Sequence, residues 1–258
     1  MTPPKQCLLE TVISVYAGHC FCKPDLQEVP VDGLELLWSA RPQPKRGPKP
    51  ALSTEQIART GIEIADAEGL AAVSMQRVAA DLGYTKMSLY RYVPGKAELV
   101  ALMADLAIGG PPPLAGNGWR EQLESWARAL LPGFARHPWA IEATTGPRIL
   151  GPNEVAWMEA ALSALDGTGL RGWERMDAVV VISGHVRMIA TQLSATPTGD
   201  PERQLGAVLV EIMREHGDRF PAVNAALTST VTDGGQDHAL DFGLARILDG
   251  IGVLIATR

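Results

Sequence analysis

Apolar residues recur at three- and four-residue intervals along most of this chain, and such spacing predicts amphipathic helices. The clearest example lies in "LSTEQIARTGIEIADAEG", where Ser53 and Gln56 have the spacing of a capping box and Gly69 is the expected C-terminal stop. The residues on its inward face are Ile57, Gly61, Ile64 and Ala65. The pattern therefore predicts a helix between Ser53 and Gly69.

Two shorter helical segments follow. In "SMQRVAADLG", Ser74 is the expected N-cap and Gly83 the expected end, and the inward face consists of Met75, Val78, Ala79 and Leu82. Thr85 is the expected cap of "KMSLYRY", in which Leu89 is the inward anchor. Two short helices joined by a tight glycine-containing turn are typical of a helix-turn-helix, whose second helix enters the major groove of DNA. We therefore expect the segment after Thr85 to contact DNA.

The chain changes character after "GGPPPLAGNG". Long stretches with helical apolar periodicity are separated there by Gly and Pro, at 117–136, 138–147, 152–166, 173–195, 201–216 and 236–256. The one β-branched run, Val179 to Ile182, lies inside a segment whose length favours a helix. The predicted fold class is all-α: a three-helix helix-turn-helix domain at residues 53–108, followed by an all-helical domain at residues 117–258.

The first 40 residues show no clear period, and we interpret them as an N-terminal extension whose order, and whose place in the native protein, stay open. Residues 41–52 form a basic, Pro-rich arm. All three cysteines lie within the first 22 residues, so no disulfide framework is expected and a reducing cytoplasm fits. Glu10 interrupts the one stretch that resembles a secretory signal, and we expect no membrane-spanning segment.

Charge is distributed unevenly along the chain, whose net charge is −6. Residues 41–110 carry nine Lys and Arg against seven acids, whereas residues 111–258 carry twelve Arg against seventeen acids. All six lysines precede residue 97. Because positive charge gathers in one short region, we expect only that region to meet a polyanion such as double-stranded DNA.

The segment "GLAAVSMQRVAADLGYTKMSLYRYVPGKAELVALM" resembles the DNA-binding domain of TetR-type (tetracycline-repressor-like) transcriptional regulators, and the resemblance covers residues 53 to about 108. It implies a homodimeric repressor that a small-molecule effector releases from a DNA operator. The expected DNA-binding residues are Arg46, Lys49, Ser74, Gln76, Thr85, Lys86, Met87, Ser88, Tyr90, Arg91, Tyr92 and Lys96.

The resemblance places Lys86, Met87 and Tyr90 at base edges, and Tyr92 and Lys96 at the DNA backbone. Side-chain chemistry supports part of this, because Lys can donate to guanine and Met can pack on a thymine methyl group. Gln76 can pair with adenine in the same way. Met75 departs from the polar residue often found at its position, and a place in the core is its alternative.

No constellation of catalytic residues is visible, so we expect no enzyme, no cofactor and no metal site. The segment "GTGLRG" at 167–172 has the spacing of a dinucleotide-binding loop but follows a predicted helix instead of a strand, and we interpret it as an interhelical loop. Cys20 and Cys22 beside His19 are too few ligands to predict a metal site.

The C-terminal half contains aromatic and polar residues suited to a small-molecule cavity, although each also suits an ordinary core. The expected ligand-binding residues are Trp126, Arg148, Trp157, His185, Met188 and Gln192. His185 is expected beside a cavity lined by the two tryptophans. A polar group on an apolar face needs a partner, which either a ligand or a dimer interface would supply.

The homodimer is expected to form through segments 173–195 and 236–256, which are long and apolar on more than one face. The candidate interface residues are Val180, Val181, Ile189, Phe242, Ile247, Leu248 and Ile251. Two other functions stay open: an effector-independent dimeric DNA-binding protein, and an all-α ligand-binding protein or enzyme with a degenerate helix-turn-helix. Neither the operator sequence, the effector, the regulated genes nor the sign of regulation follows from the sequence.

Overall fold

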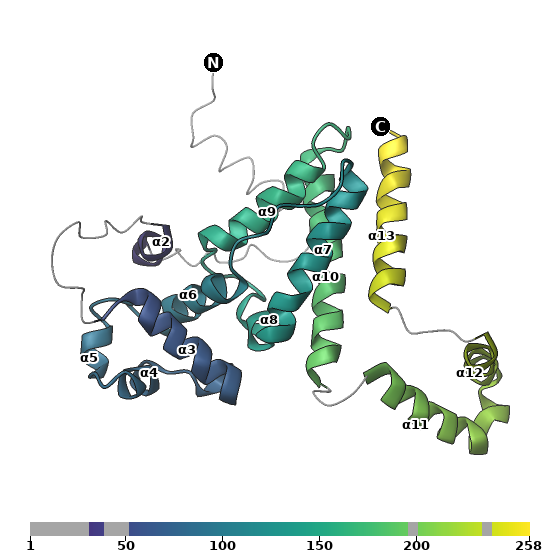
Figure 1. The fold of residues 1–258 in the computed structure, drawn as a ribbon, viewed down its shortest axis with the longest axis horizontal. Coiled ribbons are helices and arrows are strands. Elements are labelled where there is room, and N and C mark those ends of the chain that lie inside the picture. Colours follow the sequence, from purple (N-terminus) through teal and green to yellow (C-terminus); the bar gives the residue numbers. More distant parts are fainter. Residues whose placement is uncertain (1–30, 39–51, 196–200, 234–238) are drawn as a thin grey trace, which may run out of the picture. The chain divides into compact units, whose positions relative to one another are not determined.

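The computed structural model describes residues 31–38, 52–195, 201–233 and 239–258, and the regular elements in these ranges are all helices (Figure 1). Backbone contacts divide the chain into Met1–Val31 and a compact unit from Asp32 to Arg258. The second unit contains both the predicted helix-turn-helix and the predicted C-terminal helices. The all-α prediction is confirmed.

The helix-turn-helix part of this unit consists of α3 (Thr54–Glu68), the 3-10 turn η1 (Leu70–Ala72), α4 (Met75–Asp81), α5 (Lys86–Leu89) and α6 (Lys96–Ile108). The predicted caps are present. Ser53 accepts a hydrogen bond from the Gln56 backbone N–H (3.1 Å), and the Gln56 side chain accepts one from the Ser53 N–H (2.9 Å). Ser74 and Thr85 cap α4 and α5 with a hydroxyl that accepts a backbone N–H three residues on.

Helices α3, α4, α5 and α6 enclose a small apolar core. Its fully buried members include Ile57, Val78, Leu89, Val93, Leu99 and Met103. Met75 is also buried, so it belongs to this core and is not available to DNA. Gly61 lets α3 approach α6 closely, because a Cβ at this position would lie 2.6 Å from the Met103 sulfur.

The C-terminal part of the unit is built from α7 (Trp119–Arg136), α8 (Trp139–Ala143), α9 (Pro152–Ala164), α10 (Gly172–Ala195), α11 (Pro201–His216), η2 (Gly217–Arg219), α12 (Pro221–Asp233) and α13 (Ala239–Ala256). The sequence predicted most of these helices to within a few residues. The exceptions are α12, which was not predicted, and α8, which is shorter than the predicted 138–147.

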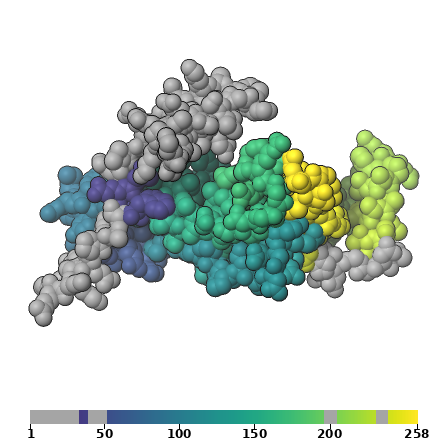
Figure 2. All heavy atoms as spheres, turned by 90° about the horizontal axis from the view of Figure 1, so that it is seen from above, coloured from purple at the N-terminus to yellow at the C-terminus, as the bar shows by residue number. Residues whose placement is uncertain are grey.

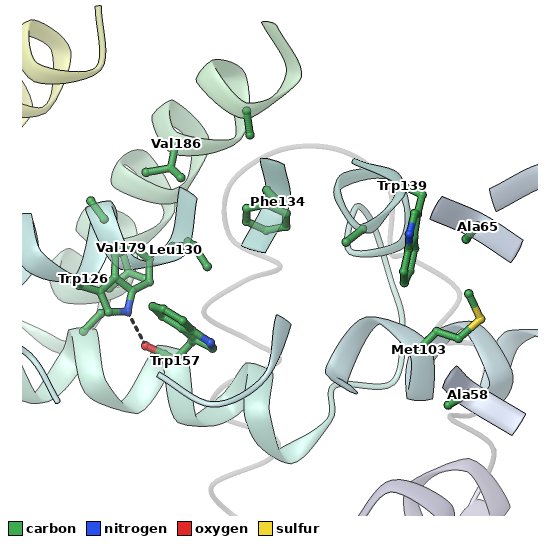
Figure 3. Packing of buried hydrophobic residues seen from close by; sticks show 14 of the residues in the cluster. Ala58, Ala65, Met103, Trp126, Leu130, Phe134, Trp139, Trp157, Val179 and Val186 are labelled. Atoms are coloured by element: carbon green, nitrogen blue, oxygen red, sulfur yellow. Dashed lines mark hydrogen bonds between the residues drawn. The ribbon is translucent and has the colours of Figure 1, made fainter. Parts of the chain in front are cut away.

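Helix α10 packs against α7, α9 and α13, and α6 connects to the same group through α7, α8 and α9. The core is therefore continuous from the helix-turn-helix to the C-terminal helices. Figure 3 shows Trp126 and Trp157 at one side of this core and Trp139 beside Ala65 and Met103 at the other, with Phe134 between them. Two ion pairs, Arg120–Asp249 (2.7 Å) and Arg128–Asp241 (2.9 Å), join α7 to α13.

The N-terminal extension ends in a helix, which the sequence analysis did not predict. Helix α2 (Val31–Trp38) places Leu37 in a small apolar cluster with Ala101 and Ile149. The Trp38 indole N–H donates to the Leu150 carbonyl (2.9 Å). The sequence left the order of residues 1–40 open, and residues 31–38 form a helix because tertiary contacts stabilise a segment that is too short to be stable alone.

Helix α10 is long and apolar enough to cross a membrane by length and composition alone, a test that the core helix of a soluble protein also passes. Only 22% of its apolar window is buried, which leaves much of its surface unaccounted for by contacts within the described residues.

Candidate DNA-binding face and effector cavity

One face of the α4–α5 pair is exposed and polar, while the opposite face is fixed by the core. Leu89 and Val93 are fully buried and hold the segment from Lys86 to Tyr92 against α3 and α4. On the outer side, the exposed residues include Gln76, Lys86, Met87, Tyr90 and Arg91. Met87 is 72% exposed, the highest exposed fraction among the large apolar side chains of the described residues.

The hydroxyl groups at the start of the two helices act as caps. Ser74 accepts from the Arg77 backbone N–H (3.1 Å), and Thr85 accepts from the Ser88 N–H (3.3 Å) and also bonds the Ser88 hydroxyl (2.9 Å). A capping hydroxyl can still donate its own hydrogen to a phosphate oxygen. Arg77 pairs with Glu68 (2.8 Å) and Asp81 (3.2 Å), which raise the pKa of its guanidinium and fix α4 to the end of α3.

The remaining predicted DNA-binding residues take different positions. Lys86 extends over the ring of Tyr90, with 5.5 Å between Nζ and the ring centroid. Tyr92 is half-buried and packs against the core, and Lys96 is exposed at the first turn of α6. Arg46 and Lys49 lie outside the described residues.

A cavity of about 130 Å³ lies among α6, α7, α9 and α10. Its apolar lining includes the predicted residues Trp126 and Trp157, and their indole rings meet edge to face with centroids 5.9 Å apart. Trp126 donates to the Trp157 carbonyl (2.8 Å; Figure 3), and Trp157 donates to the Gly109 carbonyl (2.8 Å). Because both indole N–H groups are satisfied by backbone, the tryptophans present only apolar surface to the cavity.

The polar lining of the cavity consists of Arg148, Glu154, Ser183 and Arg187. Arg148, which the sequence predicted, donates from Nε to Glu154 Oε2 (3.1 Å). Arg187 lies over the ring of Phe134, with 4.9 Å to the centroid, and reaches the Thr144 carbonyl at 3.4 Å. Burial lowers the pKa of the Arg187 guanidinium, and the nearby positive charge of Arg148 lowers it further.

Three of the predicted ligand-binding residues are not at this cavity. His185 faces α13, where its Nε2 lies 3.1 Å from the Leu240 carbonyl and its ring fills the space that a Cβ at Gly243 would need. Met188 is 59% exposed and Gln192 is also exposed, on a face of α10 directed away from the core. The expectation that His185 lies beside the cavity lined by the two tryptophans is therefore wrong, because His185 lies on another face of α10 than Ser183 and Arg187. For Met188 and Gln192, a role in ligand binding stays a prediction. The carboxylate of Glu154 and the guanidinium of Arg187 were missed.

The exposed surfaces of α10 and α13 carry large apolar side chains. On α10 they include Val180, Val181 and Met188, and on α13 they include Phe242 and Val253. Helix α13, yellow in Figure 2, forms part of the molecular surface. Two of the predicted interface residues, Ile189 and Leu248, do not belong to this exposed surface, because both are buried in the core.

A polar contact joins the end of α3 to the start of α8. The Asp66 carboxylate accepts a hydrogen bond from the Trp139 indole (2.7 Å), and His137 Nδ1 lies 2.8 Å from the same oxygen. A second contact joins α6 to α9, where Asp105 accepts from the backbone N–H groups of Asn153 (2.8 Å) and Glu154 (3.1 Å). Both contacts connect the DNA-binding helices to the C-terminal helices, and α9 lines the cavity.

Comparison with known proteins gives the family. Residues 57–103 match the family model for bacterial regulatory proteins of the tetR family, and residues 112–255 match that for the tetracyclin repressor-like C-terminal domain. The chain is 40% identical over 237 residues to the HTH-type transcriptional repressor DrrR1 of Streptomyces coeruleorubidus, which covers 87% of this chain and 86% of the relative.

Solved structures agree with this assignment. The crystal structure of apo ActR from Streptomyces coelicolor has a TM-score of 0.68 and 25% identity, covering 81% of this chain and 99% of that chain. The structure of ActR in complex with actinorhodin has a TM-score of 0.65 and 26% identity, covering 77% and 94%. The chain belongs to the TetR family of transcriptional regulators.

Proposed function

We propose that this protein is a homodimeric repressor that reads an operator with the α4–α5 face and leaves it when a small molecule occupies the cavity. The observation that carries the proposal is the exposed polar face of α4 and α5, which a buried core holds rigidly. The repressor activity named for the relative DrrR1 and the ligand complex of ActR support it. This function involves no catalytic step. Because the protein would bind chromosomal DNA, it would act in the cytoplasm.

The residues on this face have different expected roles. Lys86, Met87 and Tyr90 are at or next to the short reading helix, so we assign them to base edges in the major groove. Ser74, Thr85 and Lys96 lie at helix N-termini, which favour phosphate oxygens. Phosphate contacts position the protein without reading the sequence.

A dimer is required by the small size of this reading face. Helix α5 has only four residues, so one copy makes few base contacts. A two-fold pair doubles base and phosphate contacts and spans half-sites about 34–36 Å apart. We place the dimer interface on the exposed apolar residues of α10 and α13, because such surfaces are typical of protein association.

A ligand would release the dimer from its operator if it bound more tightly to a dimer whose two reading faces have a spacing that does not match the half-sites. A ligand shifts a conformational equilibrium only by its difference in affinity for the two states. The contacts of Asp66 and Asp105 are the expected route, since they hold the DNA-binding helices to α8 and to α9, and α9 lines the cavity.

The test compares two lysine substitutions on duplexes selected from a randomised pool. Lys86→Ala is expected to weaken binding to the best site by ~1–3 kcal/mol and to relax base preference at one position in each half-site. Lys96→Ala is expected to weaken binding to all sequences similarly and to flatten the salt dependence.

Arg214→Ala is the matched control, because Arg214 is an exposed arginine on α11 and has no assigned DNA contact. Its affinity and sequence preference should equal those of the wild type. If no sequence is enriched by the wild-type protein, or if both lysine variants lose affinity equally over the whole pool, the assignment of the reading face is wrong.

A further inference from the structure

We propose that the effector of this protein is an aromatic anion with a hydroxyl group, held between Arg187 and Glu154 against the tryptophan pair. The inference deepens the proposed function, because it names the chemical class that the cavity takes. It rests on four features of the cavity: its charge balance, an unsatisfied carboxylate oxygen, its aromatic walls and its extension along α7.

The charge balance of the cavity favours an anion. Two guanidinium groups, Arg148 and Arg187, face one carboxylate, Glu154, and that carboxylate is bonded to Arg148. Among the described residues, no carboxylate forms an ion pair with Arg187, whose partners are a carbonyl at 3.4 Å and the Phe134 ring. Glu154 is the one carboxylate among the described lining residues and acts on both arginines, so one positive charge stays unbalanced in this half-buried site. A ligand carboxylate or phenolate would supply the missing charge.

The carboxylate of Glu154 favours a hydrogen-bond donor in the same ligand. Its side chain is only 8% exposed, and its Oε1 atom has no hydrogen-bond partner in the described part of the chain. The other oxygen, Oε2, already accepts from Arg148. Because a buried acceptor without a donor is unfavourable, a ligand hydroxyl at Oε1 would be stabilised.

The walls of the cavity favour aromatic rings. Trp126, Trp157 and Phe134 supply the aromatic surface, and the two indoles have no N–H left to offer a ligand. Polar recognition therefore falls to Arg148, Glu154, Ser183 and Arg187 alone. Aromatic faces favour flat ligand rings in offset or edge-to-face contact.

A second cavity of about 190 Å³ adjoins the first and shares with it the residues Ile108, Leu130, Phe134 and Trp157. It extends along α7 past Pro132 and Gly133. Each cavity alone is smaller than the ~300–1,000 Å³ typical of small-molecule pockets. A ligand of two or more fused or linked rings would therefore occupy both.

Three probes separate charge from hydroxyl group: 6-hydroxy-2-naphthoate, its neutral amide 6-hydroxy-2-naphthamide, and 2-naphthoate. Isothermal titration calorimetry with the full chain should show the hydroxy acid binding most tightly. The amide should bind about ten- to a hundred-fold more weakly, because a charge-assisted bond is lost, and 2-naphthoate about two- to tenfold more weakly.

Variants assign these losses to residues. Arg187→Gln should reduce affinity for the hydroxy acid by about the same factor that separates acid from amide, and should leave affinity for the amide unchanged. Arg187→Lys, which keeps the charge, should recover part of the affinity. Arg214→Gln, at an exposed arginine of α11, should bind all three probes as the wild type does. Thermal unfolding of each variant establishes that it is folded.

The proposal is overturned if wild type binds acid and amide equally, if Arg187→Gln weakens both equally, or if wild type binds neither acid below ~1 mM. Selection of DNA from a randomised pool by the ligand-free protein tests the proposed function separately. Selective DNA binding with no preference for the acid would leave the repressor assignment intact and refute the ligand class. Preference for the acid without selective DNA binding would support the ligand class and refute the repressor assignment.

Discussion

Removing the indole N–H of Trp139 tests how the DNA-binding helices are held to the effector domain. Trp139 lies at the start of α8 and is buried, and its N–H donates to Asp66 near the end of α3 (2.7 Å). In Trp139→Phe the ring remains apolar while the donor is lost. His137 still contacts the same carboxylate oxygen in this variant, so Asp66 keeps one partner.

The size of the effect follows from the charge and exposure of Asp66. A hydrogen bond to a charged group contributes ~1.5–3 kcal/mol when it is buried. The Asp66 side chain is 35% exposed, so water screens the contact, and we expect about 1 kcal/mol. Trp139→Phe also removes ring atoms from the core, which costs stability for a separate reason.

A double-mutant cycle removes that second contribution. The free energy of unfolding in urea is measured for wild type, Asp66→Ala, Trp139→Phe and the double variant. The interaction free energy of the pair should be about 1 kcal/mol. The control cycle pairs Asp66→Ala with Trp157→Phe, which removes an indole N–H that donates to Gly109 instead; those two changes should add within ~0.5 kcal/mol.

The same contact should matter for regulation. If it transmits the state of the cavity to the reading face, Trp139→Phe will reduce the factor by which a bound effector weakens DNA binding, with little change in DNA affinity alone. Additivity of Asp66→Ala and Trp139→Phe would show that the hydrogen bond contributes nothing to stability. An unchanged effector response would show that regulation takes another route.

Three further predictions concern the dimer, a close contact and a buried carboxyl. Val181→Glu on the exposed face of α10 should yield monomers in sedimentation equilibrium, whereas Val208→Glu, at a similarly exposed valine of α11, should remain a dimer; a dimeric Val181→Glu would place the interface elsewhere. Gly151→Ala should lower the free energy of unfolding by ~1–3 kcal/mol, because its Cβ would lie 2.2 Å from the Asp105 carboxyl carbon; Gly206→Ala, with open space around its Cβ, should be neutral or stabilising. Burial raises the pKa of Asp105 above its usual 3.8, so between 3.8 and the raised value the folded protein binds a proton that the unfolded chain does not. Wild type should therefore gain stability relative to Asp105→Asn as pH falls from 7 toward 4 in urea unfolding, and a difference independent of pH would contradict the assignment.

The starts and ends of the DNA-binding helices could be predicted because they depend on neighbouring residues. The capping box of Ser53 and Gln56 and the caps Ser74 and Thr85 form within three residues of sequence, so a short pattern contains both partners. Gly83, with φ of +73°, lies in the turn where a left-handed conformation favours glycine.

Helices α2 and α12 could not be predicted, for different reasons. Helix α2 has only eight residues and owes its stability to contacts with Ile149 and Leu150, more than 100 positions away. The α12 segment "PAVNAALTSTVTD" contains several Thr, Val and Asn residues of modest helix propensity, and its apolar residues mark no clear face.

The residues of the candidate cavity could likewise be predicted only in part. Aromatic content predicted Trp126 and Trp157, which line it, and the need of a buried cation for a partner predicted Arg148. Helical periodicity also indicated that α10 has several apolar faces, but it cannot say which face meets which neighbour. His185 and Arg187 are two residues apart and point in roughly opposite directions, since each residue turns a helix by about 100°. Only the packing of α7 and α9 on one side of α10 and α13 on the other decided that Arg187 faces the cavity while His185 faces Leu240.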